Sequence, residues 1–113
     1  MLIRVYSIKQ QNGKIIKKID LIDNSLESME HYVGGYLKRI SLIPEKGIII
    51  LCDIHAYLKR YMVTSKWEIT NNRIEPVIIK IKGNHFICKE ENNNIMGLDD
   101  RDLKEIQQIE REI

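Results

Sequence analysis

Two β-prone runs flank an Asn-Gly dipeptide near the start of the chain, and this arrangement constrains the fold more than any other feature of the sequence. The runs are Leu2–Ile8 and Ile15–Ile22, and Asn12-Gly13 lies between them. Asn and Gly tolerate the positive φ angles of a tight turn between antiparallel strands. The sequence therefore predicts an N-terminal β-hairpin over residues 2–22.

An unbroken apolar run in the middle of the chain predicts a central strand. Gly47–Cys52 is bounded on one side by the turn Pro44-Glu45-Lys46-Gly47 and on the other by Asp53. A short apolar run without alternation is typical of a strand that is buried on both faces. The preceding segment, Tyr36–Ile43, is close enough to pair with it as an antiparallel hairpin.

A third hairpin is predicted around Gly83-Asn84. The alternation in Val77–Lys82 buries one face of a strand and points its lysines outward. Gly83-Asn84 then predicts a tight turn into a strand over His85–Cys88, and Glu90–Asn94 reads as a polar loop. The stretch Met62–Ile74 is predicted to contain a loop.

One helix is predicted over about residues 24–34. Its apolar residues recur at spacings of three and four, and Asn24 or Asp23 can cap it, with Glu27 completing a capping box. Gly34-Gly35 indicates either that the helix ends near Val33 or that another backbone packs closely there. The first alternative is favoured, because each Gly costs about 1 kcal/mol in a helix relative to Ala.

A second, acidic helix is predicted over about residues 99–112. It begins at Asp99 or Asp100, where the helix dipole favours acids, and its apolar stripe is Leu103, Ile106, Ile109 and Ile113. The fold class is therefore α+β, a single domain over residues 1–113. It combines one central and one C-terminal helix with an antiparallel sheet of five to six strands, built from hairpins and including residues 36–89.

The charge of the chain is nearly balanced but unevenly distributed. The formal net charge of the 113 residues is +2. Residues 1–89 hold 15 basic and 8 acidic side chains, whereas residues 90–113 hold 3 basic and 8 acidic ones. The small net charge argues against nucleic acid as the partner, although the basic body can attract other anions.

Cysteine content and hydropathy predict a cytoplasmic protein. The longest clean apolar run, Ile48–Cys52, is far short of the ~18 residues that a membrane span needs, and charges interrupt the N-terminal segment where a signal peptide would be apolar. Cys52 and Cys88 both lie in apolar runs, which predicts buried, reduced thiols. High Ile, Lys and Asn content with a single Ala is typical of an AT-rich bacterial host or its phages.

No metal, cofactor or catalytic centre is predicted. Cys52-x-x-His55 and His85-x-x-Cys88 together hold four residue types that bind zinc, but residues three apart in a strand face opposite sides. We therefore expect buried thiols and surface histidines. The chain also lacks the nucleophile and phosphate-loop patterns of common enzymes, so we expect it not to be an enzyme.

The candidate binding residues gather in one stretch that combines cations with aromatic rings. They are Tyr57, Lys59, Arg60, Tyr61, Lys66, Trp67 and Arg73. Such residues can form a protein interface, or can hold an anionic nucleotide by pairing phosphate with Arg and stacking a base on a ring. The third alternative places Trp67 and one Tyr in the core and leaves the cations solvated. The sequence leaves open whether residues 53–62 form a helix or a loop.

The segment Val33-Gly34-Gly35-Tyr36-Leu37-Lys38 resembles a family of small bacterial, phage and plasmid proteins grouped under a domain of unknown function. That family shows a V-G-G-Y-[IL] segment after a helix, then a strand, then an apolar strand closing on an acidic residue, as Gly47–Asp53 does here. The resemblance covers roughly residues 15–110. It departs at Thr64–Trp67, where the family often has an Asn-Arg pair. The resemblance implies an accessory protein of a mobile element, with no catalytic residues.

Two functional hypotheses follow. The first is a non-enzymatic accessory protein of a phage or mobile element that binds a host protein, including a role in counter-defence. The alternative is a protein that binds and sequesters a small anionic nucleotide signal, as a homo-oligomer, because a chain of this size needs a second subunit to form a deep pocket.

Overall fold

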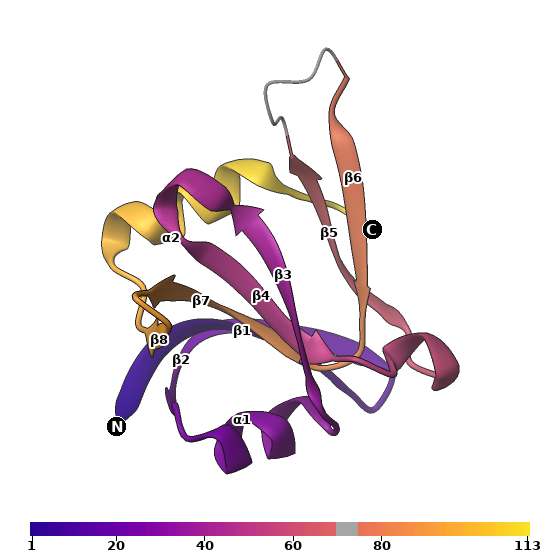
Figure 1. Ribbon diagram of the computed structural model, residues 1–113. Helices are drawn as coiled ribbons and strands as arrows, with labels where there is room; N and C mark the ends of the chain where they lie inside the picture. The colour runs from indigo at the N-terminus through magenta and orange to yellow at the C-terminus, as the bar shows by residue number, and fades with distance from the viewer. Residues whose placement is uncertain (70–74) are drawn as a thin grey trace.

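The computed structural model describes residues 1–69 and 75–113 and contains two helices and two β-sheets (Figure 1). The strands are β1 (Leu2–Gln11), β2 (Lys14–Asp23), β3 (Leu37–Ile43), β4 (Ile48–Asp53), β5 (Val63–Ile69), β6 (Val77–Lys82), β7 (His85–Glu91), β8 (Asn94–Met96) and β9 (Glu110–Arg111). The helices are α1 (Leu26–Val33) and α2 (Asp100–Ile109), with the 3-10 turns η1 (Pro44–Lys46) and η2 (Ala56–Leu58). The predicted α+β class with two helices is confirmed.

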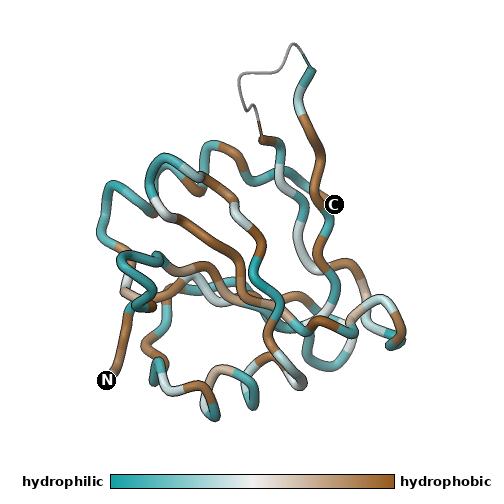
Figure 2. Tube along the Cα trace, viewed as in Figure 1, coloured by the Kyte–Doolittle hydropathy of each residue, from teal (hydrophilic) through white to brown (hydrophobic). Residues whose placement is uncertain are grey.

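The main sheet has the strand order β2-β1-β7-β4-β3, and β8 pairs with β7. All six residues of β4 are buried, and Figure 2 shows this strand as a hydrophobic segment inside the sheet. Ile50 and Cys52 pack on one face of the sheet, and Ile49 and Leu51 pack on the other. The prediction of a central strand buried on both faces is confirmed, and so is its hairpin with β3.

Helix α1 covers one face of the main sheet. Its buried residues, Met29 and Val33, pack against Phe86 of β7. The helix ends at Val33, as favoured from the sequence, and Gly34 caps it with a left-handed φ of 83°. The predicted N-cap is wrong: the Ser25 hydroxyl, and not Asn24 or Asp23, accepts the hydrogen bond from the Ser28 N–H at 3.3 Å.

The second sheet, with the order β6-β5-β9, and helix α2 cover the other face of the main sheet (Figure 1). Trp67 of β5 and Ile106 of α2 are fully buried there, in one cluster with Ile50 and Ile87 of the main sheet. Lys80 and Lys82 of β6 are exposed, which confirms that the lysines of this strand point outward. The sequence did not predict this second sheet, which combines β5 and β6 with β9 near the end of α2.

The predicted hairpin at Gly83-Asn84 is wrong. β6 pairs with β5 in the second sheet, whereas β7 pairs with β4 and β1 in the main sheet. Gly83 has a φ of 77°, and a Cβ atom built on it would lie 2.5 Å from the Tyr61 ring. The glycine is therefore needed for a sharp turn that carries the chain from one sheet to the other, past a packed tyrosine.

Three further segments differ from the prediction. The polar stretch at 90–94 is a hairpin between β7 and β8, because Asn92 and Asn93 both adopt the positive φ of a tight turn. Within the stretch Met62–Ile74, which was expected to contain a loop, residues 63–69 form β5, and residues 70–74 lie outside the described residues. The last helix ends at Ile109 and not near residue 112, because Glu110 and Arg111 leave it to pair with β5. The terminal Ile113 is 61% exposed and does not belong to the apolar stripe.

Neither α1 nor α2, the two helices of the described residues, is long and apolar enough to cross a membrane.

Candidate functional site

The two glycines after α1 lie against the buried carboxylate that ends β4. A Cβ atom at Gly35 would come within 2.4 Å of Asp53 Oδ1, and Gly34 already has a left-handed φ. The Asp53 side chain is 1% exposed. The sequence left two alternatives for Gly34-Gly35, a helix end or a closely packed neighbour, and the structure has both features: α1 ends there and another group packs closely. That neighbour is a side chain and not another backbone.

Asp53 is the centre of a group of contacts that we call the Asp53 clamp, which comprises Asp53, Lys59, Tyr61, Gly34 and Gly35. The carboxylate accepts hydrogen bonds from Lys59 Nζ, from the His55 N–H at 2.9 Å and from the Tyr61 hydroxyl at 3.4 Å. Lys59 Nζ also donates to the Gly34 carbonyl at 3.0 Å. The clamp therefore joins the end of α1, the end of β4 and the segment that carries η2.

The Asp53 clamp keeps its acid ionised. Burial is the largest influence on this carboxyl group and disfavours its charge, but the bonds from Lys59 and the His55 N–H outweigh it and hold the pKa of Asp53 below its usual value. The charge of Asp53 is thus satisfied within the protein. Lys59 and Tyr61, two of the predicted site residues, both bond to Asp53 and thereby position the segment between β4 and β5.

Segments on both sides of the Asp53 clamp expose large apolar and aromatic side chains. Tyr36 is 71% exposed, and on η2 Tyr57 is 73% and Leu58 is 69% exposed. Ile54, just after β4, is 42% exposed. Aromatic residues held on a well-braced segment are frequent anchors of protein interfaces, because they lose little conformational entropy on binding.

A groove of about 220 Å³ separates the edge of β3 from β6. Its lining includes the apolar side chains of Ile40, Cys52 and Ile81, together with Tyr57 of η2. The lysines among its lining residues are Lys38, Lys80 and Lys82. This groove is the place where the two sheets come close without pairing, so each side ends in a strand edge with no strand neighbour among the described residues.

A row of cations crosses the outer face of the second sheet beside this groove. Lys66 of β5 lies directly opposite Lys80 of β6 on one side and Arg111 of β9 on the other. Arg111 is paired with Glu68 at 2.8 Å, whereas no ion pair joins Lys66 or Lys80 to any described acid. Like charges directly opposite on neighbouring strands are destabilising, so this arrangement has a cost that an anionic partner would remove.

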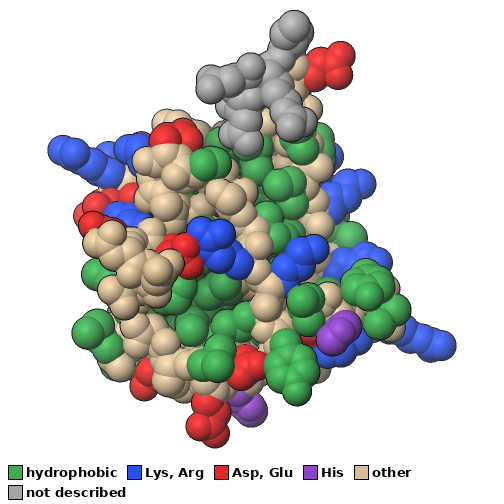
Figure 3. All heavy atoms as spheres, viewed as in Figure 1, with side chains coloured by type: hydrophobic (Ala, Val, Ile, Leu, Met, Phe, Trp, Pro, Cys, Tyr) green, Lys and Arg blue, Asp and Glu red, His purple; other side chains and the backbone are tan. Residues whose placement is uncertain are grey.

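We call Lys38, Lys66, Lys80 and Lys82 the cationic face. Figure 3 shows Lys and Arg side chains on the side of the molecule where β6 lies, next to apolar side chains. Of its members, only Lys66 was predicted from the sequence. The signal for Lys80 and Lys82 was present in the alternation of β6, but Lys38 is brought near them only by the tertiary fold.

The remaining predicted site residues lie in different environments. Arg60 is exposed just after η2, and Tyr57 lies in the groove lining. Trp67 is fully buried, in line with the alternative that placed it in the core, and is not accessible to a ligand. Arg73 lies outside the described residues. Residues 53–62, left open between helix and loop, contain only the three-residue turn η2.

The four residues with zinc-binding side chains do not converge. Cys52 packs on the α2 side of the main sheet and Cys88 packs on the α1 side. His55 is exposed, whereas His85 is fully buried, so the expectation of surface histidines is wrong for His85. Among the described residues, no group of three or more His, Cys, Asp or Glu side chains is placed to hold a metal ion. Burial raises the pKa of Cys52 to about 11 and that of Cys88 to about 12, so both thiols are protonated.

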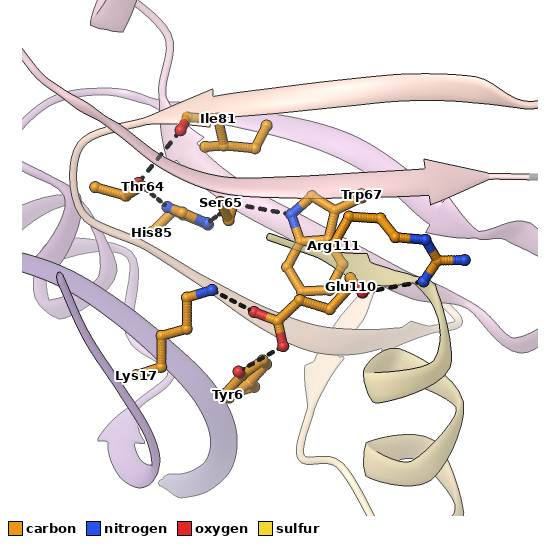
Figure 4. A network of polar contacts seen from close by, with 9 residues as sticks. All are labelled: Tyr6, Lys17, Thr64, Ser65, Trp67, Ile81, His85, Glu110 and Arg111. Carbon is orange, nitrogen blue, oxygen red and sulfur yellow. Dashed lines mark hydrogen bonds and ion pairs between the residues drawn. The ribbon is translucent and has the colours of Figure 1, made fainter. Parts of the chain in front are cut away.

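A serine and a histidine form a close but inaccessible pair between the two sheets (Figure 4). Ser65 Oγ lies 2.7 Å from His85 Nε2, and the Trp67 indole donates to the same oxygen at 2.8 Å. His85 Nδ1 lies 2.9 Å from the Gly83 carbonyl, which only accepts, so Nδ1 carries the proton and Ser65 donates to Nε2. Both side chains are fully buried, so substrate cannot reach Ser65 as a nucleophile. Because Ser65 lies on β5 and His85 lies on β7, their hydrogen bond instead joins the two sheets.

Burial lowers the pKa of His85 to about 4, against a weaker opposing effect of its bond to the Gly83 carbonyl.

On the same side of the main sheet, Glu110 of β9 accepts from the Tyr6 hydroxyl at 2.8 Å and from Lys17 at 2.6 Å (Figure 4). These contacts explain why the chain leaves the helix after Ile109, since an extended Glu110 reaches partners on both strands of the N-terminal hairpin.

The fold and the site together define a small two-sheet α+β domain, in which a buried carboxylate braces an exposed aromatic segment beside a cationic groove. The chain belongs to the family described as Domain of unknown function (DUF3846), whose family model matches residues 3–111. This match confirms the resemblance to a family of unknown function. No curated protein and no solved structure matched this chain.

Proposed function

We propose that this protein is a non-enzymatic binding protein, and that an acidic segment of another protein binds in the groove between β3 and β6. The observation that carries the proposal is the cationic face, where Lys66 and Lys80 lie opposite each other without an acidic partner among the described residues. In the setting implied by the family resemblance, the chain is an accessory protein of a phage or mobile element. Its partner is then a cytoplasmic protein of the bacterial host, and proteins of host defence systems belong to this class of partners.

The shape of the groove supports a protein segment over a nucleotide. A volume of about 220 Å³ is below the ~300 Å³ at which pockets for small molecules begin, and the groove is open at the surface. The N-terminus of α2, the kind of position that binds phosphate, is occupied by its own acids, because Asp99 and Asp102 cap each other's backbone N–H groups. An extended peptide needs only a shallow channel and a strand edge.

Charge and apolar contacts supply the two parts of the interaction. The cationic face attracts an acidic segment and accelerates its encounter, an effect that weakens with salt. Tyr57, which lines the groove, and Leu58, which follows it in η2, provide exposed apolar area, and aromatic anchors of this kind contribute much of the affinity of an interface. The Asp53 clamp holds the segment that carries these two residues, because Asp53 bonds to His55 before η2 and to Lys59 after it, and this lowers the entropy lost on binding.

The proposal is tested by comparing three forms of the tagged protein as bait in a host lysate. The groove variant carries Lys38→Glu, Lys80→Glu and Lys82→Glu. The matched control carries Lys14→Glu, Arg101→Glu and Lys104→Glu, which reverses three exposed cations outside the groove. We expect a host protein that the wild type and the control retain and that the groove variant loses. Mass spectrometry of the wild-type bait, after denaturation, also reports any bound nucleotide.

Each outcome decides between the hypotheses. Equal retention of every protein by all three baits contradicts the groove as the binding site. A nucleotide that accompanies the wild type but not the groove variant, with no protein retained, overturns the protein partner and supports sequestration of an anionic signal. Circular dichroism of the three forms checks that each is folded.

A further inference from the structure

Strand β2 is a ten-residue edge of the main sheet that pairs only with β1 among the described residues. Three large apolar side chains along it are exposed, Ile16 at 40%, Ile19 at 50% and Leu21 at 60%. A long edge strand presents unpaired backbone N–H and C=O groups, which makes it a template for pairing with another strand. This edge is at the opposite side of the main sheet from the groove, so it has a separate role.

The tight turn at Asn12-Gly13 determines which backbone groups of β2 face outward. In a two-residue hairpin the flanking pair, here Gln11 and Lys14, exchanges hydrogen bonds, and such pairs then alternate along the ladder. The even-numbered residues of β2 therefore bond to β1, and the odd-numbered residues from Ile15 to Asp23 face the free edge. In agreement, the Leu21 N–H bonds to the carboxylate of Asp20 at 2.8 Å.

We propose that a second copy of this chain pairs with β2 in antiparallel fashion, about a two-fold axis at Ile19. The five outward-facing residues are symmetric about Ile19, so placing Ile19 opposite the partner's Ile19 aligns all five with outward-facing residues of the partner. Lys17 then lies opposite the partner's Leu21, and Ile15 lies opposite the partner's Asp23. The two strands form one continuous antiparallel ladder, and the interface is the same on both subunits.

The charges of β2 select this register over its neighbours. With the axis at Ile19, Lys18 lies opposite the partner's Asp20, and the symmetry repeats this complementary pair. Moving the axis by one residue places Lys18 opposite the partner's Lys18, or Asp20 opposite the partner's Asp20. Either shift puts like charges together and leaves one outward-facing residue of each strand without a partner.

The existing contacts of Asp20 are compatible with this exchange. In the single chain, the Asp20 carboxylate accepts a hydrogen bond from the Leu21 N–H. It also forms an ion pair with Lys18 of the same strand, in which Lys18 Nζ lies 3.7 Å from Asp20 Oδ2. In the dimer the Leu21 N–H bonds to the carbonyl of the partner's Lys17, and the carboxylate is released for the partner's Lys18. The exposed Ile16 comes opposite the partner's Ile22, and the two copies of Ile19 cover each other.

The proposal is tested on the full chain by light scattering coupled to gel filtration, from about 5 μM to about 500 μM. We expect the wild type to dimerise, and we expect Ile19→Lys to raise the dissociation constant at least about a hundredfold, because two lysines would face each other at the axis. The matched control is Leu26→Lys, which replaces an exposed apolar side chain on α1 and should leave the dimer intact. A wild type that stays monomeric throughout, or a dimer that Ile19→Lys leaves unchanged, overturns the proposal.

Cross-linking tests the register independently of how the lysine variant folds. Ile19→Cys places two thiols opposite each other at the axis, within the range of a disulfide, so mild oxidation should produce a covalent dimer. Leu21→Cys, on the same face, places its thiols about 14 Å apart along the strands at ~3.4 Å per residue, so it should remain uncrosslinked. Equal cross-linking of the two variants, or none in either, contradicts this register. The native Cys52 and Cys88 are buried and do not compete.

Discussion

Acidification should destabilise this protein through His85. In the folded state burial lowers the pKa of His85 to about 4, whereas the unfolded chain has the ordinary value of 6.5. Between these values the unfolded state binds a proton that the folded state excludes, so stability is complete above pH 6.5 and is lost as the pH falls toward 4. At 1.36 kcal/mol for each pH unit, the loss reaches about 3 kcal/mol. That is a large part of the ~5–15 kcal/mol that stabilises a typical domain.

The loss is measurable by urea unfolding at pH 7.5 and pH 4.5, followed by the fluorescence of Trp67. The wild type should lose about 2.5 kcal/mol of unfolding free energy between these conditions, since pH 4.5 lies two units below the unfolded value. The variant His85→Gln starts lower, because it disturbs the bonds to Ser65 and Gly83, but its stability should fall less with pH. Carboxylates held below their usual pKa, such as Asp53, contribute only at more acidic pH.

The matched control is His55→Gln, which removes an exposed histidine and should retain the full pH dependence. The reasoning is refuted if wild-type stability is the same at both pH values. It is also refuted if His85→Gln loses as much stability as the wild type, because another group would then take up the proton.

Three further perturbations test the packing and the charge arrangement. Gly35→Ala should lower the free energy of unfolding in urea by about 2 kcal/mol, because its methyl group would overlap the Asp53 carboxylate. Gly13→Ala, which has open space around it, should lower it by about 1 kcal/mol from its positive φ alone. Equal losses in the two variants would contradict the close approach at Gly35. Lys80→Glu should raise the unfolding free energy by about 0.5 kcal/mol, since it turns a like-charge pair into a complementary one, and a loss of stability would mean that the pair is already compensated. Cys52 and Cys88 should react with a thiol reagent at least about a hundredfold more slowly in buffer than in urea, because burial keeps both protonated; rapid reaction in buffer would show that the sheet opens.

The parts of the fold that depend on neighbouring residues were predictable from the sequence. Asn12-Gly13 specifies a turn by its backbone conformation alone, and the apolar run of β4 indicates burial on both faces without reference to any partner. The end of α1 follows from its glycines in the same way. Each of these signals lies within a few residues of the element that it determines.

The remaining parts depend on contacts between distant segments. Gly83-Asn84 is a turn in either arrangement, and only the pairing of β6 with β5 shows that it joins two sheets. Trp67 could be an anchor or a core residue until the second sheet covers it. The cationic face has the same origin, because Lys38 and Lys80 are far apart in sequence and meet at a groove whose sides belong to different sheets.

The position of β7 has a consequence for how this chain folds. β7 is the seventh strand in sequence but lies between β1 and β4, pairing Tyr6 with Ile87 and Ile49 with Cys88. Contacts over such separations must close long loops before they contribute stability, so we expect slow, topology-limited folding. During synthesis, the inner edges of β1 and β4 stay unpaired until residues 85–91 have left the ribosome. The nascent chain therefore carries two hairpins with open inner edges, vulnerable to aggregation, until β7 inserts between them.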